Sequence, residues 1–140
     1  MRILVSACLL GVCCRYDGNS KPCQAVVDLA KEHELIPVCP EQLGGLPTPR
    51  PPAEIQGGRV INREGRDVTA QYQKGAEEAA RLVRLLGCDC AILKARSPSC
   101  GSGQVYDGSF SGTLVPGDGI AAGTLKTLGV RVISEQDLAD

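Results

Sequence analysis

The sequence predicts an α/β fold, a Rossmann-like three-layer sandwich with a mainly parallel central sheet. Short apolar runs recur along the chain, and segments with apolar residues at helical spacing lie between them. Strands that alternate with helices form mainly parallel sheets with helices on both faces. With 140 residues, the chain is expected to form one domain, residues 1–140.

The expected strands of this sheet are four short apolar runs. Short, nearly continuous apolar runs are typical of strands that are buried on both faces of a parallel sheet. Their ranges are 2–6, 35–38, 90–93 and 130–133.

Three helices are expected between these strands. We expect them to begin at Ser20, Thr69 and Asp118, because each of these side chains can cap a helix. Gly87 and Gly129 follow the second and third helices, as glycines commonly do. The second helix has the clearest apolar face, made of Tyr72, Ala76, Ala79, Val83 and Leu86.

The remaining segments predict turns and a stiff loop. Residues 55–62 alternate around Gly57 and Gly58, which indicates a hairpin. The Asp107–Gly108 pair gives residues 105–110 the same signal. Residues 44–52 contain four prolines and two glycines, so this segment is expected to be a loop.

Composition and charge exclude several classes of function. The net charge of −1 does not suggest a large nucleic-acid surface, although small basic patches and a tRNA substrate are not excluded. One Phe, three Tyr and no Trp argue against a base-stacking platform. No apolar run approaches the ~20 residues of a membrane span. Residues 5–8 resemble a lipoprotein cleavage site, but too few apolar residues precede them for a secretory signal.

The chain is therefore expected in the cytoplasm, where structural disulfides are rare. Its eight cysteines then need another explanation, either burial or a metal or catalytic role.

Three cysteines stand apart because each follows an expected strand. Cys8 follows the first strand, Cys39 the second, and Cys100 lies in the loop after the third. Ligands of open α/β sheets bind beyond the carboxyl ends of the strands, and neighbouring strands are only ~4.8 Å apart. The pattern predicts that these three thiols share one metal site or cluster.

The other cysteines have less specific patterns. Cys23, Cys88 and Cys90 are interpreted as small buried apolar residues. The roles of Cys13 and Cys14 stay open, because adjacent side chains diverge and rarely bind one metal together.

Two alternative sites fit the spacing less well. Structural zinc sites usually have paired ligands such as C-x2-C, whereas these three cysteines are isolated and His33 is expected to be an ordinary surface residue. A phosphatase loop needs an arginine after five intervening residues, but Cys14 stands there and Arg15 comes one position later. The glycine-rich signatures of dinucleotide and nucleoside triphosphate sites are absent from the sequence.

Two further residues are candidates because they lie beside the thiols in the sequence. Glu41, two residues after Cys39, can transfer protons next to a bound group. Ser97 opens the segment 97–103, whose hydroxyls and backbone N–H groups can support a cluster and orient a substrate.

Four segments together resemble the thiouracil desulfidase family, long catalogued only as a bacterial domain of unknown function. They are SACLLG at 6–11, PVCPE at 37–41, GGLPTPR at 44–50 and SPSCG at 97–101. The resemblance covers essentially the whole chain, and the segments are specific in combination.

The resemblance implies a [4Fe–4S] cluster held by Cys8, Cys39 and Cys100, with one iron left open to take the sulfur of a thiolated pyrimidine. It implies a non-redox hydrolytic desulfuration, with Glu41 as the acid/base group and Ser97 as the active-site serine. Some relatives carry a second domain and act on thiolated uridine in tRNA. The 140 residues are expected to form one domain without a second, so a thiolated free base or nucleoside is the expected substrate.

Two rival interpretations remain at this stage. One is a non-catalytic iron–sulfur redox or sensor protein that uses the same cysteines, and the other is a structural zinc protein. The physiological substrate and the oligomeric state are left open.

Overall fold

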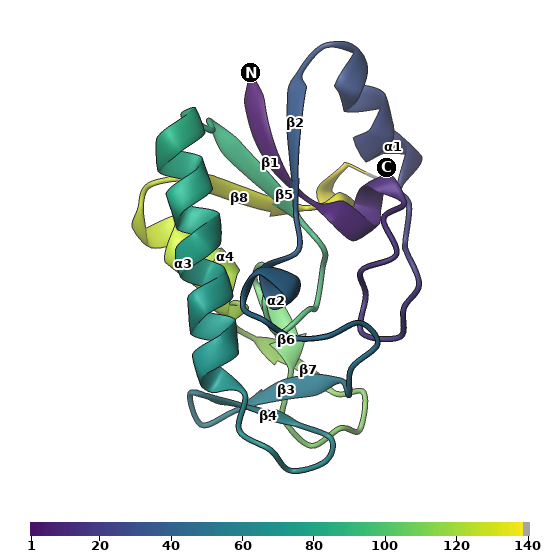
Figure 1. Cartoon of the computed structure of the whole chain (residues 1–140), viewed down its shortest axis with the longest axis vertical. Coiled ribbons are helices and arrows are strands. Elements are labelled where there is room, and N and C mark those ends of the chain that lie inside the picture. Colours follow the sequence, from purple (N-terminus) through teal and green to yellow (C-terminus); the bar gives the residue numbers. More distant parts are fainter. Residues whose placement is uncertain (139–140) are drawn as a thin grey trace.

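The computed structural model describes residues 1–138 and contains a four-stranded, wholly parallel central sheet. The strand order is β2-β1-β5-β8 (Figure 1). The strands are β1 Arg2–Ser6, β2 Glu34–Val38, β5 Cys90–Leu93 and β8 Arg131–Ser134. The predicted α/β fold class and the four predicted strands are therefore confirmed, although β2 begins one residue earlier than predicted and β8 is shifted by one residue.

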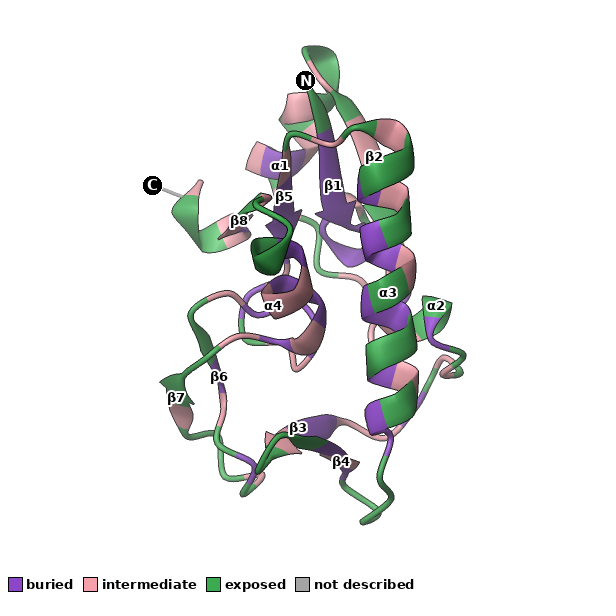
Figure 2. Cartoon of the chain, turned by 90° about the vertical axis from the view of Figure 1, so that its left-hand side faces the viewer, coloured by how far each residue is buried: buried purple, intermediate pink, exposed green. Residues whose placement is uncertain are grey.

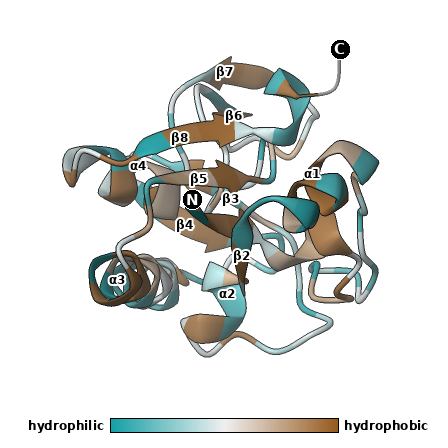
Figure 3. Cartoon of the chain, turned by 90° about the horizontal axis from the view of Figure 1, so that it is seen from above, coloured by the Kyte–Doolittle hydropathy of each residue, from teal (hydrophilic) through white to brown (hydrophobic). Residues whose placement is uncertain are grey.

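Helices cover both faces of the sheet, which makes three layers (Figure 3). Helices α3, Thr69–Leu86, and α4, Ile120–Thr127, pack on one face, and the short α1, Gln24–Asp28, packs on the other. Successive side chains of β1 pack on opposite faces of the sheet: Leu4 packs on the α3 side, whereas Ile3 and Val5 pack on the α1 side. No helix within residues 1–138 is long and apolar enough to cross a membrane.

Two hairpins lie beyond the carboxyl ends of the strands (Figure 1). One pairs β3, Ala53–Gln56, with β4, Arg59–Asn62, and the other pairs β6, Gln104–Tyr106, with β7, Leu114–Pro116. The first turns at Gly57–Gly58, as predicted.

The second hairpin does not turn at Asp107–Gly108, because the whole of loop 107–113 connects its strands. Buried Glu54 holds this loop, since its Oε1 accepts hydrogen bonds from Gly108 N at 2.9 Å and Phe110 N at 3.1 Å. The two hairpins are thereby joined to each other.

Helix α2, Pro40–Leu43, crosses α3 at unusually close range. A Cβ on Gly75 of α3 would lie 1.9 Å from Pro40 O, and one on Gly44 would lie 1.9 Å from Gln71 O. Only glycine permits such contact between backbones. Figure 2 shows α3 running the length of the molecule, from the β3–β4 hairpin to the sheet, with α2 against its flank.

This crossing makes Gly75→Ala a destabilising change. The methyl group would meet a backbone carbonyl that cannot rotate away, so α2 must move, and we expect a loss of about 3 kcal/mol or more in the free energy of unfolding. Gly123→Ala in α4 is the matched control, because its added Cβ would meet only Asp118 Cβ at 3.8 Å. The control should gain up to about 1 kcal/mol from helix propensity. Urea unfolding of both variants checks this, and equal effects would contradict the close crossing.

The predicted cap of α3 was wrong in detail. Thr69 is the first helical residue rather than the cap. Its hydroxyl accepts the N–H of Val60 in β4 at 2.8 Å, while Asp67 Oδ1 accepts the N–H of Thr69 at 2.9 Å. The threonine therefore joins α3 to the hairpin.

The other two helix starts also differ from prediction. Cys23, not Ser20, precedes the first residue of α1. Gly119 stands at the cap of α4, because the Asp118 carboxylate instead accepts the N–H of Gly103 at 2.8 Å. For Asp118, a tertiary partner takes precedence over local capping.

Candidate functional site

The topology brings the loops that carry the three singled-out cysteines to one edge of the sheet. The chain leaves β1 for β2 on one side and later returns to β5 on the other, so the strand order reverses between β1 and β5. Ligands of open α/β sheets bind beyond the carboxyl ends at such a point. Cys8 lies in the 3-10 turn after β1, Cys39 directly after β2, and Cys100 in the loop after β5.

The electrostatics show that these thiols lie near one another. Burial raises the pKa of Cys8 to about 11, and Cys39 adds to the rise. Burial likewise raises the pKa of Cys100 to about 12, against a lowering hydrogen bond with Ser6, and Glu41, Cys8 and Cys39 raise it further. Cys8 and Cys100 are buried and Cys39 is half-buried, and Glu41, Cys8 and Cys39 all lie close enough to Cys100 to affect its pKa.

Cys14 also belongs to this environment, which the sequence pattern did not indicate. It is buried, and its carbonyl accepts a hydrogen bond from Cys39 Sγ at 3.6 Å. Burial raises the pKa of the Cys14 thiol, with further contributions from Cys39 and Cys8. A cysteine that follows no strand becomes a neighbour of the site because loop 11–19 folds back over it.

The remaining cysteines lie elsewhere. Cys13 is exposed. Cys23 and Cys90 are half-buried against the core on the α1 side, and Cys88 is half-buried against the α3 side. These three pack as the small apolar residues that the sequence predicts.

Ser97 shapes the loop that carries Cys100. Its Oγ accepts hydrogen bonds from the N–H groups of Ser99 at 3.1 Å and Cys100 at 3.0 Å. Its carbonyl accepts the N–H of Gly101 at 2.8 Å, which closes the turn. Both acceptor positions of the hydroxyl are used, so its own proton remains available to a ligand.

The same loop is fastened to the start of α4. Ser99 O accepts the N–H of Ala121 at 2.9 Å, and Gly119 approaches so closely that a Cβ there would lie 2.5 Å from the Ser99 carbonyl. The position of Cys100 is therefore set by a rigid element of the fold.

Glu41 is the acceptor of a buried hydrogen-bond network. Its Oε1 accepts from Arg50 Nε at 2.9 Å and from the Tyr72 hydroxyl at 2.8 Å. Burial opposes the charge of Arg50, but the Glu41 carboxylate more than compensates and the pKa of Arg50 is raised. Burial, followed by the charge of Glu41, raises the pKa of Tyr72. Tyr72 therefore stays protonated at neutral pH and donates a hydrogen bond to Glu41.

A second ion pair lies near Cys8. Lys94 Nζ is 3.1 Å from Glu135 Oε2, and both side chains are largely buried. The Lys94 charge lowers the pKa of Cys8, which opposes the larger effect of burial. The N–H of Lys94 also donates to Ser6 Oγ at 2.8 Å, so the pair is tied to the end of β1.

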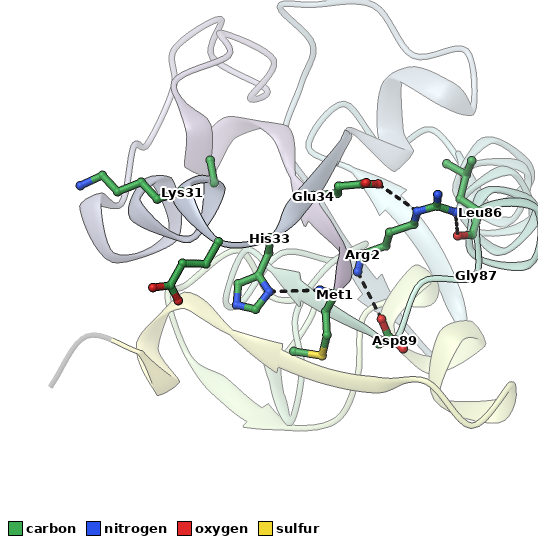
Figure 4. A pocket seen from close by; sticks show the side chains of 10 residues that line it. Met1, Arg2, Lys31, His33, Glu34, Leu86, Gly87 and Asp89 are labelled. Carbon is green, nitrogen blue, oxygen red and sulfur yellow. Dashed lines mark hydrogen bonds and ion pairs between the residues drawn. The ribbon is translucent and has the colours of Figure 1, made fainter.

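An open depression of about 620 Å³ lies at the opposite, amino end of the sheet (Figure 4). Three of its charged residues contact one another: Arg2 Nε pairs with Glu34 at 2.9 Å, and Arg2 N donates to Asp89 at 3.2 Å. His33, which the sequence predicts to be a surface residue, lines this depression and is remote from the thiols. The depression and the thiol site are therefore separate features.

The donor set suits a cluster better than a single metal ion. Zinc needs its thiolate ligands at about 2.3 Å from one centre, and no three His, Cys, Asp or Glu side chains in the described part of the chain converge in that way. In an iron–sulfur cluster each cysteine binds a different iron, so the sulfurs stand farther apart.

Comparison with known proteins identifies the family. A family model described as 2-thiouracil desulfurase matches residues 3–137. The chain belongs to this family. The resemblance noted in the sequence is thereby confirmed.

Two relatives extend the match over nearly the whole chain. YbbK of Bacillus subtilis (strain 168), described as uncharacterized, is 43% identical, and the alignment covers 99% of this chain and 98% of YbbK. A solved structure described as the [4Fe-4S]-dependent thiouracil desulfidase TudS is 47% identical, with a TM-score of 0.93. The match covers 98% of this chain and 92% of TudS. The desulfurase family and the TudS fold are thus shared.

Proposed function

We propose that this protein is an iron–sulfur-dependent desulfidase that removes the sulfur of a thiolated pyrimidine and releases the oxo product and hydrogen sulfide. The observation that carries the proposal is the placement of Cys8, Cys39 and Cys100 after three neighbouring strands at the carboxyl edge of the sheet, with Glu41 in the helix that directly follows Cys39. Membership of the 2-thiouracil desulfurase family and the likeness to TudS support the substrate class and the cofactor.

Cys8, Cys39 and Cys100 would hold a [4Fe–4S] cluster. When bound through three cysteines, such a cluster offers one iron without a protein ligand, which supplies Lewis-acid chemistry toward a thiocarbonyl sulfur. The Lys94 ammonium near Cys8 helps to balance the negative charge of the thiolates.

Glu41 is the proposed acid/base residue. It would take a proton from the attacking water and give one to the departing sulfur. A carboxylate can do so only where a substrate reaches it, and Glu41 lies close enough to Cys100 to raise the pKa of that thiol.

Ser97 is the proposed substrate-positioning residue. Two backbone N–H groups fix its oxygen, so its proton can point toward a polar atom of the pyrimidine or toward the attacking water. The same two hydrogen bonds fix the loop that carries Cys100. The position of the substrate would therefore be tied to the position of the Cys100 thiol.

A non-catalytic iron–sulfur sensor remains the main alternative, because it would use the same cysteines. The Glu41 network favours the enzyme, since a sensor has no need of a buried, doubly hydrogen-bonded carboxylate beside its thiols.

We propose a free thiolated base or nucleoside as the substrate, and thiolated tRNA is the less favoured candidate. We propose the cytoplasm as the location of the protein.

Turnover assays of anaerobically prepared protein test the function. Cluster-loaded protein should convert 2-thiouracil to uracil, and the same protein stripped of iron by a chelator should not. 2-Thiouridine and a tRNA with thiolated uridine, assayed in parallel, separate the three substrate sizes. Loaded protein that binds 2-thiouracil but forms no uracil would favour the sensor.

A further inference from the structure

Among the described residues, hydrogen bonds reach only one oxygen of the Glu41 carboxylate. Both Arg50 Nε, at 2.9 Å, and the Tyr72 hydroxyl, at 2.8 Å, donate to Oε1. Within residues 1–138, Ser99 Oγ is the only fully buried side-chain nitrogen or oxygen without a hydrogen-bond partner. Oε2, which accepts no hydrogen bond from the described residues, is therefore still accessible.

The two donors are held by separate parts of the fold. Arg50 also donates to Pro47 O at 3.1 Å, to Thr48 Oγ1 at 3.0 Å and to Cys14 O at 2.9 Å, so its guanidinium cannot turn. Its side chain is only 4% exposed.

Tyr72 is fixed from the other side. It is 2% exposed and lies on α3, one turn before Gly75. There the backbone of α3 meets that of α2, the helix that carries Glu41. The contact between the helices thus sets the distance between the hydroxyl and the carboxylate.

We propose that Tyr72, together with Arg50, is a positioning residue that holds Oε1 of Glu41 and so presents Oε2 alone to the substrate and water. The inference rests on the proposed acid/base role of Glu41. The terminal torsion of a glutamate side chain has a broad energy minimum, so a carboxylate with one donor could rotate and exchange its two oxygens. Two donors on one oxygen, approaching from different elements, prevent this exchange.

Tyr72→Phe removes the hydroxyl and leaves the buried ring in place. We expect kcat for 2-thiouracil to fall on the order of 10- to 100-fold, the usual effect of a small misplacement of a reacting group, with KM nearly unchanged. Iron content and the cluster absorbance should equal those of the wild type. Tyr106→Phe in β6, the same chemical change, is the control and should keep full kcat. Arg50→Lys keeps the positive charge but loses the planar set of guanidinium N–H donors, so this variant should also lower kcat.

A double-mutant cycle distinguishes positioning from a general structural role. If Tyr72 acts through Glu41, then Tyr72→Phe should cost almost nothing further in a Glu41→Gln background. Additive losses, or full kcat in the Tyr72→Phe single variant, would overturn the inference while leaving the proposed function intact. A Glu41→Gln variant with wild-type kcat would instead remove the acid/base role, and the inference would fall with it. Cluster loss in Tyr72→Phe would also overturn the inference, because a pure positioning residue does not hold iron.

Discussion

Replacing Cys8, Cys39 or Cys100 by serine is expected to remove the cluster and, with it, all turnover of 2-thiouracil. Anaerobic wild-type protein should contain about four irons and four inorganic sulfides per chain, the content of a cubane cluster. Iron–sulfur sites require soft thiolate ligands, which a serine hydroxyl does not replace. With only three protein ligands proposed, loss of one leaves too few bonds to hold the cluster in its loops. Iron and sulfide analysis with the visible spectrum measures the effect.

Two cysteines outside the site are matched controls for this prediction. Cys23→Ser and Cys88→Ser make the same change at half-buried positions away from the group of thiols, and both should keep iron, sulfide and turnover. Cys14→Ser should keep the cluster as well, although Cys14 lies beside Cys39. A loss in Cys14→Ser as severe as in the three ligand variants would contradict the ligand assignment.

Glu41→Gln is expected to keep the cluster and to lose turnover on the order of 10²- to 10⁴-fold, the usual contribution of general acid–base catalysis. Such a loss corresponds to about 3–5 kcal/mol of transition-state stabilisation. The amide oxygen of glutamine can still accept from Arg50 and Tyr72, so the shape of the network is kept. The buried Arg50 charge loses its partner, however, and the protein should also lose up to about 3 kcal/mol of stability. Steady-state kinetics per bound cluster, measured well below the unfolding temperature, separates the two effects.

Glu34→Gln is the control for this variant. Glu34 forms an ion pair of the same length, 2.9 Å, with Arg2 at the amino end of the sheet, but its side chain is 70% exposed. That variant should lose neither turnover nor more than a few tenths of a kcal/mol of stability. If Glu41→Gln lost its iron outright, Glu41 would be a ligand or a structural residue. Near-normal turnover in Glu41→Gln would refute the proposed mechanism.

The central sheet, and the positions of Cys8, Cys39 and Cys100 after its strands, could be predicted from sequence because both follow from local pattern and general topology. Buried parallel strands leave short apolar runs, and residues after such strands meet at one edge. Glu41 and Ser97 could be singled out because they are near those cysteines in the sequence.

Cys14 and Tyr72 could not be connected to the site in this way. Tyr72 fits the apolar face of α3, and nothing local shows that its hydroxyl meets Glu41, 31 residues away. Cys14 reaches Cys39 only through the path of loop 11–19. The cap of α3 was mispredicted for the same reason, since the Thr69 hydroxyl accepts a hydrogen bond from Val60 in strand β4. Long-range partners decided each of these cases.

The source of the oxygen in the product tests the central claim most directly. Cluster-loaded protein should be incubated anaerobically with 2-thiouracil in ¹⁸O-labelled water, without oxidant or reductant, and the uracil and sulfide measured. Hydrolysis exchanges the sulfur for one oxygen of water, so we predict one labelled oxygen per uracil and one sulfide released per turnover. Uracil without the label, or turnover that requires an added redox reagent, would contradict a hydrolytic desulfidase.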